Sequence, residues 1–280
     1  MTRSLILAPG LEPFPGYKLG NLLGKGGWGE VWRADDAAGK PCALKFMAQR
    51  NIAAAYEIRA LNAIKELRHP NLLGIDKIWS AAGYLVIQMP LADGSLHDLL
   101  DVYYTELNHP ITGDHVCFFL RQAAEAIDFF NARQHMVNDQ RMAFRHCDVK
   151  PSNLLLVGET VKLADFSIAF PTGSPMVTHS RAGSLDYAAP EVFGNLYSER
   201  SDQFSLAVTY YQLRTGRLPF PTAKSFSSPH QRPAPDLSGL EKDEGQVLLR
   251  ALHSVPQDRW PSCRELLAAL SSCVCHAAPA

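Results

Sequence analysis

The sequence predicts an α+β chain in which a small β-rich N-terminal part is followed by a larger helical part. Short runs rich in β-branched and aromatic residues, separated by Gly and Asp turns, fill most of residues 17–89. Beyond residue 90, apolar residues recur at spacings of three and four, as on one face of a helix. The length of 280 residues accommodates one large domain or two lobes.

Five strands and one helix are expected in the β-rich part. The strands are expected at residues 17–23, 30–34, 41–47, 72–80 and 84–89. A run of Asp, Ala, Gly and Lys between the second and third strands is typical of a turn. The helix is expected over residues 53–67, because this stretch is rich in Ala, Leu, Glu and Lys and stops before a His-Pro pair.

Three helices can be placed in the second part of the chain. The spacing of apolar residues predicts an amphipathic helix over residues 116–130. Residues 202–213 are apolar almost all round, which predicts a buried helix that Gly216 ends. The last helix is expected to begin at Ser262-x-x-Glu265, the pattern of a capping box.

Composition and charge exclude several classes of protein. Hydrophobic residues make up 46% and charged residues 20%, which fits a soluble globule and excludes disorder and collagen. A net charge of -1 provides no basic field for nucleic acid or an anionic membrane. No apolar run approaches the ~18 residues of a membrane span, and the opening MTRSLILAPG is too short in its apolar part for a secretory signal. Six cysteines without a CxxC pair favour a reducing, cytoplasmic setting.

A glycine pattern lies between the first two expected strands. Gly24, Gly26, Gly29 and Val31 have the spacing G-x-G-x-x-G-x-V. Glycines let a backbone approach phosphate oxygens without a Cβ atom in the way. A Rossmann turn has similar glycines, but it joins a strand to a helix. The position between two strands disfavours that interpretation, and a plain hairpin remains the alternative.

A lysine lies inside the third, apolar strand. Lys45 follows Val31 by fourteen residues, and a buried ammonium is costly unless an anion compensates it. Glu57, on the helix that follows, is the preferred protein partner, and Glu66 is the alternative. Nucleotide phosphates are a further candidate, and a lysine at a strand edge with its ammonium in water is the structural explanation that requires no ligand.

Polar residues with the chemistry of phosphoryl transfer gather around an apolar strand. Asp148, Lys150 and Asn153 precede it, and Asp165 follows Asp148 by seventeen residues. An Asp can accept a hydroxyl proton, a Lys can neutralise phosphate, and an Asn and an Asp can hold Mg²⁺. A loop or cap carboxylate is the alternative for each acid taken alone.

Five motifs in order resemble those of eukaryotic-type protein kinases, in their bacterial-like form. They are the glycine pattern, Ala43-Leu44-Lys45, His146-Cys147-Asp148, Asp165-Phe166-Ser167 and Ala189-Pro190-Glu191. The resemblance implies a two-lobed protein-kinase-like fold, with a small β-rich N-lobe and a larger helical C-lobe. The expected parts are an extension of residues 1–16, a kinase domain of residues 17–272 with lobes at 17–89 and 90–272, and a tail of residues 273–280.

The resemblance also implies the cofactors ATP and Mg²⁺ and a set of site residues. The residues implied to contact ATP are Gly24, Gly26, Gly29, Val31, Ala43, Lys45, Met89 and Leu155. The residues implied to act in catalysis are Lys45, Glu57, Asp148 and Lys150. The metal ligands implied are Asn153 and Asp165.

The function that the resemblance implies is phosphorylation of protein Ser or Thr hydroxyls by Mg-ATP. Lys150-Pro151 resembles serine/threonine rather than tyrosine kinases, and residues 183–188 resemble the family's peptide-docking stretch, with Ser184 where Thr is usual. A pseudokinase or nucleotide-binding scaffold is the alternative, and a kinase of small molecules is a third hypothesis. The expected partners are ATP and protein substrates, without nucleic acid or a membrane span, and no feature of the sequence indicates an oligomeric state.

Two further residues depart from the family pattern. Cys147 replaces the Arg that pairs with an activating phosphate, so phosphorylation should matter less for activity. The candidate phosphorylation sites are Thr172, Ser174, Thr178 and Ser180. Ser167 replaces a Gly, which should restrict flips of this segment because Ser adopts positive φ poorly. The resemblance further implies that Arg259 pairs with Glu191.

Overall fold

A computed structural model describes most of the chain. The described residues are 5–27, 29–48, 53–137, 139–172, 184–221 and 232–274, without the side chains of residues 53–57, 59 and 137. The chain divides into two units. Unit 1 comprises residues 1–68 and 73–93, and unit 2 comprises residues 69–72 and 94–280.

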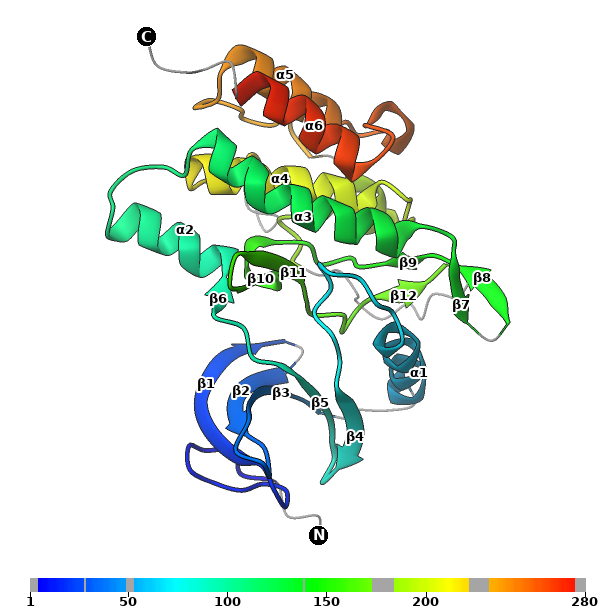
Figure 1. Cartoon of the computed structure of the whole chain (residues 1–280). Coiled ribbons are helices and arrows are strands. Elements are labelled where there is room, and N and C mark those ends of the chain that lie inside the picture. The colour runs from blue at the N-terminus through cyan, green and yellow to red at the C-terminus, as the bar shows by residue number, and fades with distance from the viewer. Residues whose placement is uncertain are drawn as a thin grey trace. The chain divides into compact units, whose positions relative to one another are not determined.

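Unit 1 is built on a five-stranded antiparallel sheet of strand order β1-β2-β3-β5-β4 (Figure 1). Its elements are β1 (Lys18–Gly26), β2 (Gly29–Asp35), β3 (Pro41–Ala48), α1 (Ala53–Lys65), β4 (Lys77–Ala81) and β5 (Tyr84–Pro90). The prediction of five strands and one helix in this part of the chain is confirmed, and β3 and α1 begin at the residues expected.

Two strand boundaries differ from the prediction by more than one residue. β1 does not stop at residue 23, because its ladder with β2 continues through the glycines to the pair Gly26 and Gly29. β4 begins at Lys77 instead of residue 72. Leu72 instead makes an isolated parallel bridge with Leu163, and both residues belong to unit 2. Hydrogen bonds between strands therefore set the end of β1 and the start of β4, and the pattern of apolar residues does not reveal these bonds.

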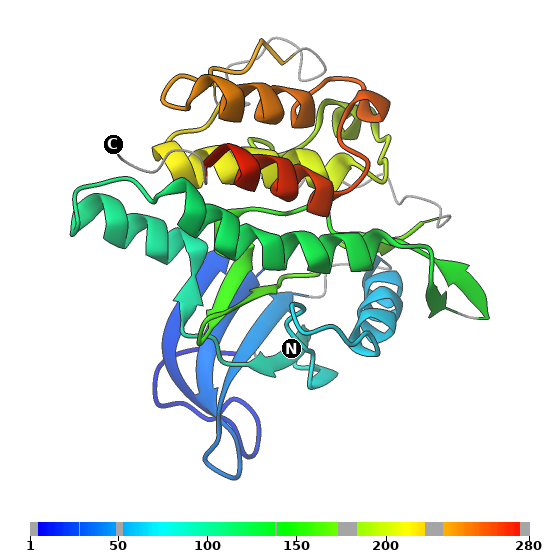
Figure 2. The same ribbon diagram turned by 45° about the horizontal axis from the view of Figure 1, so that its top comes forward.

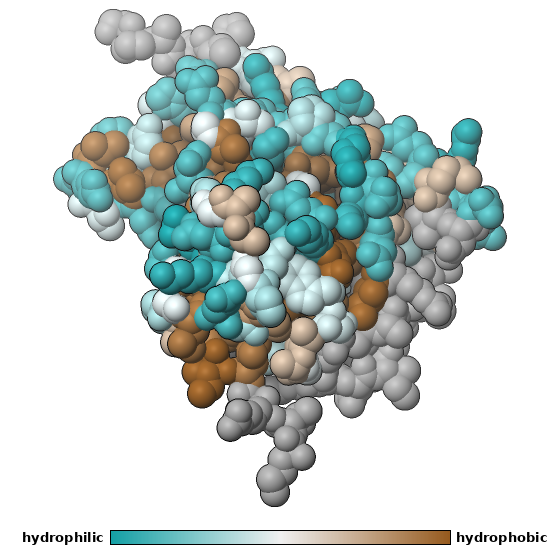
Figure 3. Space-filling model, turned by 60° about the horizontal axis from the view of Figure 1, so that its bottom comes forward, coloured by the Kyte–Doolittle hydropathy of each residue, from teal (hydrophilic) through white to brown (hydrophobic). Residues whose placement is uncertain are grey.

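One face of the unit 1 sheet carries a hydrophobic core. Its buried members are Leu19, Trp32, Ala34, Cys42, Leu44, Phe46 and Val86. Phe14, from the segment before β1, stacks on Phe46 with ring centroids 6.0 Å apart. Because side chains alternate along a strand, the residues between these core positions point to the other face. Among the coloured residues on the face in view in Figure 3, hydrophilic ones predominate and apolar ones form separate patches.

Unit 2 is mainly helical. Its long helices are α2 (Leu96–Thr105), α3 (Gly113–Asn131), α4 (Ser201–Thr215), α5 (Lys242–Ala251) and α6 (Cys263–Val274). α3 and α4 lie side by side, α6 packs on α3, and α5 packs on α6 and α4 (Figures 1 and 2). Among the described residues, no helix combines the length and the apolar character that crossing a bilayer requires.

Short strands complete unit 2. β6 (Gly94–Ser95), β10 (Leu154–Val157) and β11 (Thr160–Leu163) form a three-stranded sheet in the order β11-β10-β6. β7 (His135–Val137) and β8 (Gln140–Met142) form a hairpin, and β9 (Phe144–Arg145) pairs with β12 (Phe170–Pro171). The hairpin lies in the connection between α3 and β9.

α4 is the buried helix that the sequence predicts. Twelve of its fifteen residues are buried, so it packs against neighbours on all sides. Gly216 follows it with φ +69°, a conformation that suits glycine, and donates its N–H to the Gln212 carbonyl. The buried side-chain amide of Gln203 bonds to the backbone of Trp260 at both ends. Gln203 Nε2 donates to the Trp260 carbonyl at 2.9 Å, and Gln203 Oε1 accepts the Trp260 N–H at 3.1 Å.

The start of α6 differs in detail from a local capping box. Ser262 Oγ accepts the Glu265 N–H at 3.1 Å, as predicted. The N–H groups of Cys263 and Arg264 instead donate to the carboxylate of Asp128, on α3, at 2.9 and 3.0 Å. A carboxylate at a helix N-terminus satisfies unpaired N–H groups and opposes the helix dipole, so this start is shared between two helices.

Candidate active site

A buried carboxylate on α4 holds the turn that carries the candidate catalytic residues. Asp202 is 1% exposed and accepts the N–H groups of His146 and Cys147, at 3.0 and 2.9 Å. Cys147 has φ +68°, an unfavourable value for a residue other than glycine. Two hydrogen bonds to a charged acceptor therefore stabilise a strained turn immediately before Asp148. The sequence motifs gave Asp202 no role at the site, although a carboxylate at the start of a helix predicted to be buried was a usable signal.

Asp148 is the centre of this cluster. Its side chain is 6% exposed, and its two oxygens accept three hydrogen bonds. Oδ2 accepts from Lys150 Nζ at 2.9 Å and from Asn153 Nδ2 at 2.9 Å, while Oδ1 accepts the Ser184 N–H at 2.8 Å. Lys150 Nζ also donates to Ser184 Oγ at 2.7 Å. The structure thus brings together three predicted site residues and Ser184 of the candidate docking stretch.

Asn153 and Asp165 are adjacent and present oxygen atoms. The Asn153 amide nitrogen donates to both the carbonyl and the carboxylate of Asp148, so the amide oxygen is the atom left for a cation. The Ala164 N–H donates to the Asn153 carbonyl at 2.9 Å and brings the next residue, Asp165, beside it. The described residues contain no group of three or more His, Cys, Asp or Glu that could hold a metal. One carboxylate and one amide oxygen fit Mg²⁺, which binds few protein ligands alongside water and phosphates.

The segment Asp165-Phe166-Ser167 is held on both sides. The Phe166 ring makes an edge contact with the His146 ring, with centroids 5.4 Å apart. His146 Nε2 in turn lies 3.0 Å from the Ala164 carbonyl oxygen. Ser167 Oγ donates to Asp165 Oδ1 at 2.6 Å. Phe166 therefore packs on the turn that contains His146, and the two polar residues of the segment bond to each other.

In unit 1, the predicted nucleotide-contacting side chains share one face of the sheet. Val31 and Lys45 are aligned across β2 and β3, and Ala43 and Met89 are aligned across β3 and β5. Ala43 and Lys45 lie two residues apart, so all four point away from the hydrophobic core face. Lys45 is only 5% exposed. In unit 2, the predicted contact Leu155 lies in β10, where it is aligned with Ser95 of β6.

The glycines of the β1–β2 turn fall into two kinds. Gly29 has φ +126°, and a Cβ added there would lie 2.0 Å from the carbonyl oxygen of Phe46. The fold itself therefore requires glycine at this position. A Cβ at Gly24 or Gly26 would meet no atom of the described residues within 4 Å. Packing within the described chain does not explain these two glycines, which is the pattern expected where a backbone must leave room for a ligand.

The partner of Lys45 stays a prediction. Glu57 lies on α1, but its side chain is outside the described residues. Glu66 follows the end of α1, and its N–H donates to the Ala63 carbonyl at 3.3 Å.

The segment after Ser184 is fixed to α4. Ser205 Oγ donates to the Tyr187 carbonyl at 2.9 Å, and the Tyr187 hydroxyl donates to Gln212 Oε1. Burial raises the pKa of Tyr187 to about 12, so its hydroxyl keeps its proton at neutral pH. Gly183 lies outside the described residues.

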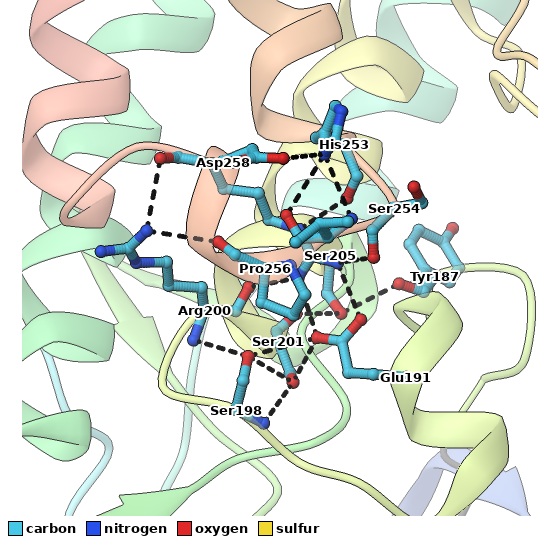
Figure 4. Close-up of polar contacts among 12 residues, drawn as sticks. Tyr187, Glu191, Ser198, Arg200, Ser201, Ser205, His253, Ser254, Pro256 and Asp258 are labelled. Atoms are coloured by element: carbon cyan, nitrogen blue, oxygen red, sulfur yellow. Dashed lines mark hydrogen bonds and ion pairs between the residues drawn. The ribbon is translucent and has the colours of Figure 1, made fainter.

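A buried ion pair anchors the next part of the chain and confirms a predicted pairing. Arg259 Nη1 and Nη2 donate to the two carboxylate oxygens of Glu191 at 2.8 and 2.7 Å. Ser201 Oγ also donates to Glu191, at 2.8 Å, and Ser198 lies beside them (Figure 4). Burial alone would raise the pKa of Glu191, but the hydrogen bonds and charge of Arg259 lower it overall.

Comparisons with known proteins agree with this arrangement. The model of the family described as "Protein kinase domain" matches residues 17–270. The chain is similar to serine/threonine-protein kinase PknF of Mycobacterium tuberculosis, with 30% identity over 92% of this chain and 56% of PknF. It is similar to PknD of the same organism, with 29% identity over 90% of this chain and 39% of PknD. The chain thus spans about half or less of the length of these curated relatives.

A solved structure is similar along almost the whole chain. The crystal structure of the Mycobacterium tuberculosis PknI kinase domain, in a mutant form, has a TM-score of 0.72 and 27% sequence identity. The similarity covers 95% of this chain and 98% of that one. The expected fold class, an N-terminal β-rich part followed by a helical part, is therefore confirmed.

Proposed function

The chain belongs to the protein kinase domain family, and from this premise we propose that it is an active serine/threonine kinase that transfers the γ-phosphate of Mg-ATP to protein hydroxyls. The observation that carries the proposal is the buried carboxylate of Asp148, which accepts hydrogen bonds from Lys150, Asn153 and Ser184. A scaffold that only bound nucleotide would not require this set of polar groups. Similarity to serine/threonine kinases supports the choice of acceptor.

Asp148 is the proposed catalytic base. In the proposed step, the acceptor hydroxyl oxygen bonds to the γ-phosphorus, the bond to the β-bridging oxygen breaks, and the hydroxyl proton passes to a carboxylate oxygen of Asp148. The three donors hold that carboxylate in one orientation before the acceptor arrives, which lowers the cost of positioning. Lys150 is proposed to neutralise charge on the transferred phosphate, and its ammonium already lies 2.9 Å from Asp148.

Asn153 and Asp165 are the proposed ligands of Mg²⁺, which when bound supplies neutralisation of phosphate charge. Lys45 is proposed to bind the α- and β-phosphates and Glu57 to orient it. The other residues proposed to contact ATP are Gly24, Gly26, Gly29, Val31, Ala43, Met89 and Leu155. Two observations support this assignment: the open space that the described residues leave at the first two of these glycines, and the shared sheet face of Val31, Ala43 and Met89.

A protein acceptor is proposed over a small molecule because of the segment that begins at Ser184. This residue bonds to both Asp148 and Lys150, so a chain docked along residues 184–188 would bring its hydroxyl toward the proposed base. A small-molecule kinase has no need of such a segment.

The test is transfer of radiolabelled phosphate from ATP to a generic protein acceptor in the presence of Mg²⁺. Asp148→Asn is expected to reduce the rate of transfer by about 10²–10⁴-fold, the usual contribution of a general base. Asp236→Asn, at an exposed loop acid of the same type, is the matched control and should keep it. Label on Ser or Thr of the acceptor supports the proposal. Nucleotide binding without transfer would identify a pseudokinase, and label found only on small molecules would identify the third class.

A further inference from the structure

A short hydrogen bond joins the two polar residues of Asp165-Phe166-Ser167. Ser167 Oγ donates to Asp165 Oδ1 at 2.6 Å, and the Ser167 N–H donates to the same oxygen at 3.3 Å. Ser167 is 7% exposed, so little water competes for its hydroxyl. A glycine at this position would supply only the longer of these two bonds.

The backbone explains why a second bond is useful here. Asp165 has φ +64°, a left-handed conformation that is costly for a residue with a Cβ. Ser167 is not among the described residues with positive φ, so a side chain at position 167 causes no such strain in this conformation. Ser167 therefore stabilises the strained Asp165 through its hydroxyl without adding strain of its own.

The two bonds also restrict the carboxylate. Both reach Oδ1, so rotation about the Cβ–Cγ bond of Asp165 would break them. Together they fix the plane of the carboxylate. The backbone beside it is fixed as well, because the Ala164 N–H donates to the Asn153 carbonyl at 2.9 Å.

We propose that Ser167 is a positioning residue whose hydroxyl holds the Asp165 carboxylate in the orientation that receives Mg²⁺ together with nucleotide; this inference rests on the proposed function. A side chain ordered before binding loses less entropy when the ion arrives. The hydroxyl should therefore reduce the concentration of Mg²⁺ that is needed for tight nucleotide binding, and it should have no effect on binding without the metal.

Three substitutions separate the hydroxyl from the backbone. Ser167→Ala removes the hydroxyl and keeps the Cβ, and Ser167→Gly removes both. Ser167→Thr keeps the hydroxyl. A role for the hydroxyl predicts that Ala and Gly behave alike and that Thr resembles the wild type, whereas a role for backbone restriction alone predicts that Ala resembles the wild type.

The experiment measures ADP binding by calorimetry across a series of Mg²⁺ concentrations, so that it requires no phosphate transfer. Ser167→Ala and Ser167→Gly are expected to need roughly fivefold more Mg²⁺ than the wild type for the same ADP affinity, the scale of one lost hydrogen bond. With EDTA in place of Mg²⁺, all variants should bind ADP equally.

Ser238→Ala is the matched control. Ser238 donates its N–H to Asp236 Oδ1 at 2.9 Å in the same Asp-x-Ser spacing, but on an exposed loop, so this variant should keep the wild-type Mg²⁺ dependence. Wild-type Mg²⁺ dependence in Ser167→Ala would overturn the inference, whatever Ser167→Gly does. A wild-type protein that binds no ADP at any Mg²⁺ concentration would overturn the proposed function as well, and the two failures are thereby distinguished.

Discussion

The turn of unit 2 that carries Asp148 and the glycine turn of unit 1, between β1 and β2, are held in opposite ways. Asp148 accepts three hydrogen bonds from its own chain, and the turn before it is bonded to the buried carboxylate of Asp202. β1 is exposed along most of its length. A Cβ at Gly24 or Gly26 would meet no atom of the described residues within 4 Å.

This difference indicates that the two regions do different work. The turn that carries Asp148 is held by hydrogen bonds from its own chain, so changes in the groups that hold it should reduce stability or the rate of transfer. The β1–β2 turn leaves space along its backbone, so changes there should reduce nucleotide affinity and leave stability unchanged. Gly29 is the exception, because the fold requires it.

The largest loss of stability is expected when the buried ion pair between Arg259 and Glu191 is broken. Arg259→Met should lower the free energy of unfolding by about 3–5 kcal/mol, because it leaves the Glu191 carboxylate buried without its partner. Denaturant unfolding measures the change. Arg264→Met is the control, since the side chain of Arg264 is 69% exposed in its pair with Asp128; it should cost no more than about 1 kcal/mol. Equal losses in both variants would contradict the distinction between buried and exposed pairs.

The two kinds of glycine provide a sharper test within one turn. Gly29→Ala should destabilise the protein by about 1–3 kcal/mol, because its φ is +126° and its Cβ would meet the Phe46 carbonyl. Gly26→Ala should change stability by no more than about 0.5 kcal/mol, since its Cβ has open space. It should nevertheless weaken ATP binding severalfold. Thermal unfolding and nucleotide titration of both variants measure the two effects, and the comparison fails if Gly26→Ala loses stability while keeping affinity.

The buried ion pair should also show in the pH dependence of stability. Because the pKa of Glu191 is lowered from 4.5 in the folded state, its contribution is fully present above pH 4.5 and is lost as pH falls through the folded value. The stability difference between the wild type and Glu191→Gln should therefore shrink below about pH 4.5. Urea titrations between pH 7 and pH 3 measure it, and a difference independent of pH would refute the assignment.

The smallest effect is expected for dephosphorylation. Phosphatase treatment should leave appreciable transfer activity, because Cys147 cannot bind an activating phosphate as Arg does. The described residues that flank these candidate sites also bond to other parts of the chain. The Thr172 N–H donates to the Ala143 carbonyl at 2.7 Å, and Ser184 bonds to Asp148 and Lys150. The candidate sites Ser174, Thr178 and Ser180 lie outside the described residues. Mass spectrometry of the treated protein and an assay of its rate check this, and a strict requirement for phosphate would contradict it.

Several features of the fold follow from local sequence alone. Residues 202–213 were correctly predicted to form a buried helix, because their apolar residues are spread around the helix and not confined to one face. The glycine after it ends the helix with a positive φ that glycine adopts easily. The five motifs in their order were enough to predict the fold class. Arg259 was also correctly expected to pair with Glu191.

Other features depend on which segments meet in three dimensions. Asp202 bonds to a turn more than fifty residues earlier in the chain, Ser184 lies against Asp148, and Asp128 caps α6 from another helix. Periodicity and turn residues reflect interactions between residues that are close in the sequence, whereas these bonds form between residues that are far apart in it. Only the folded path of the chain brings each donor to its acceptor, and so only the tertiary structure decided them.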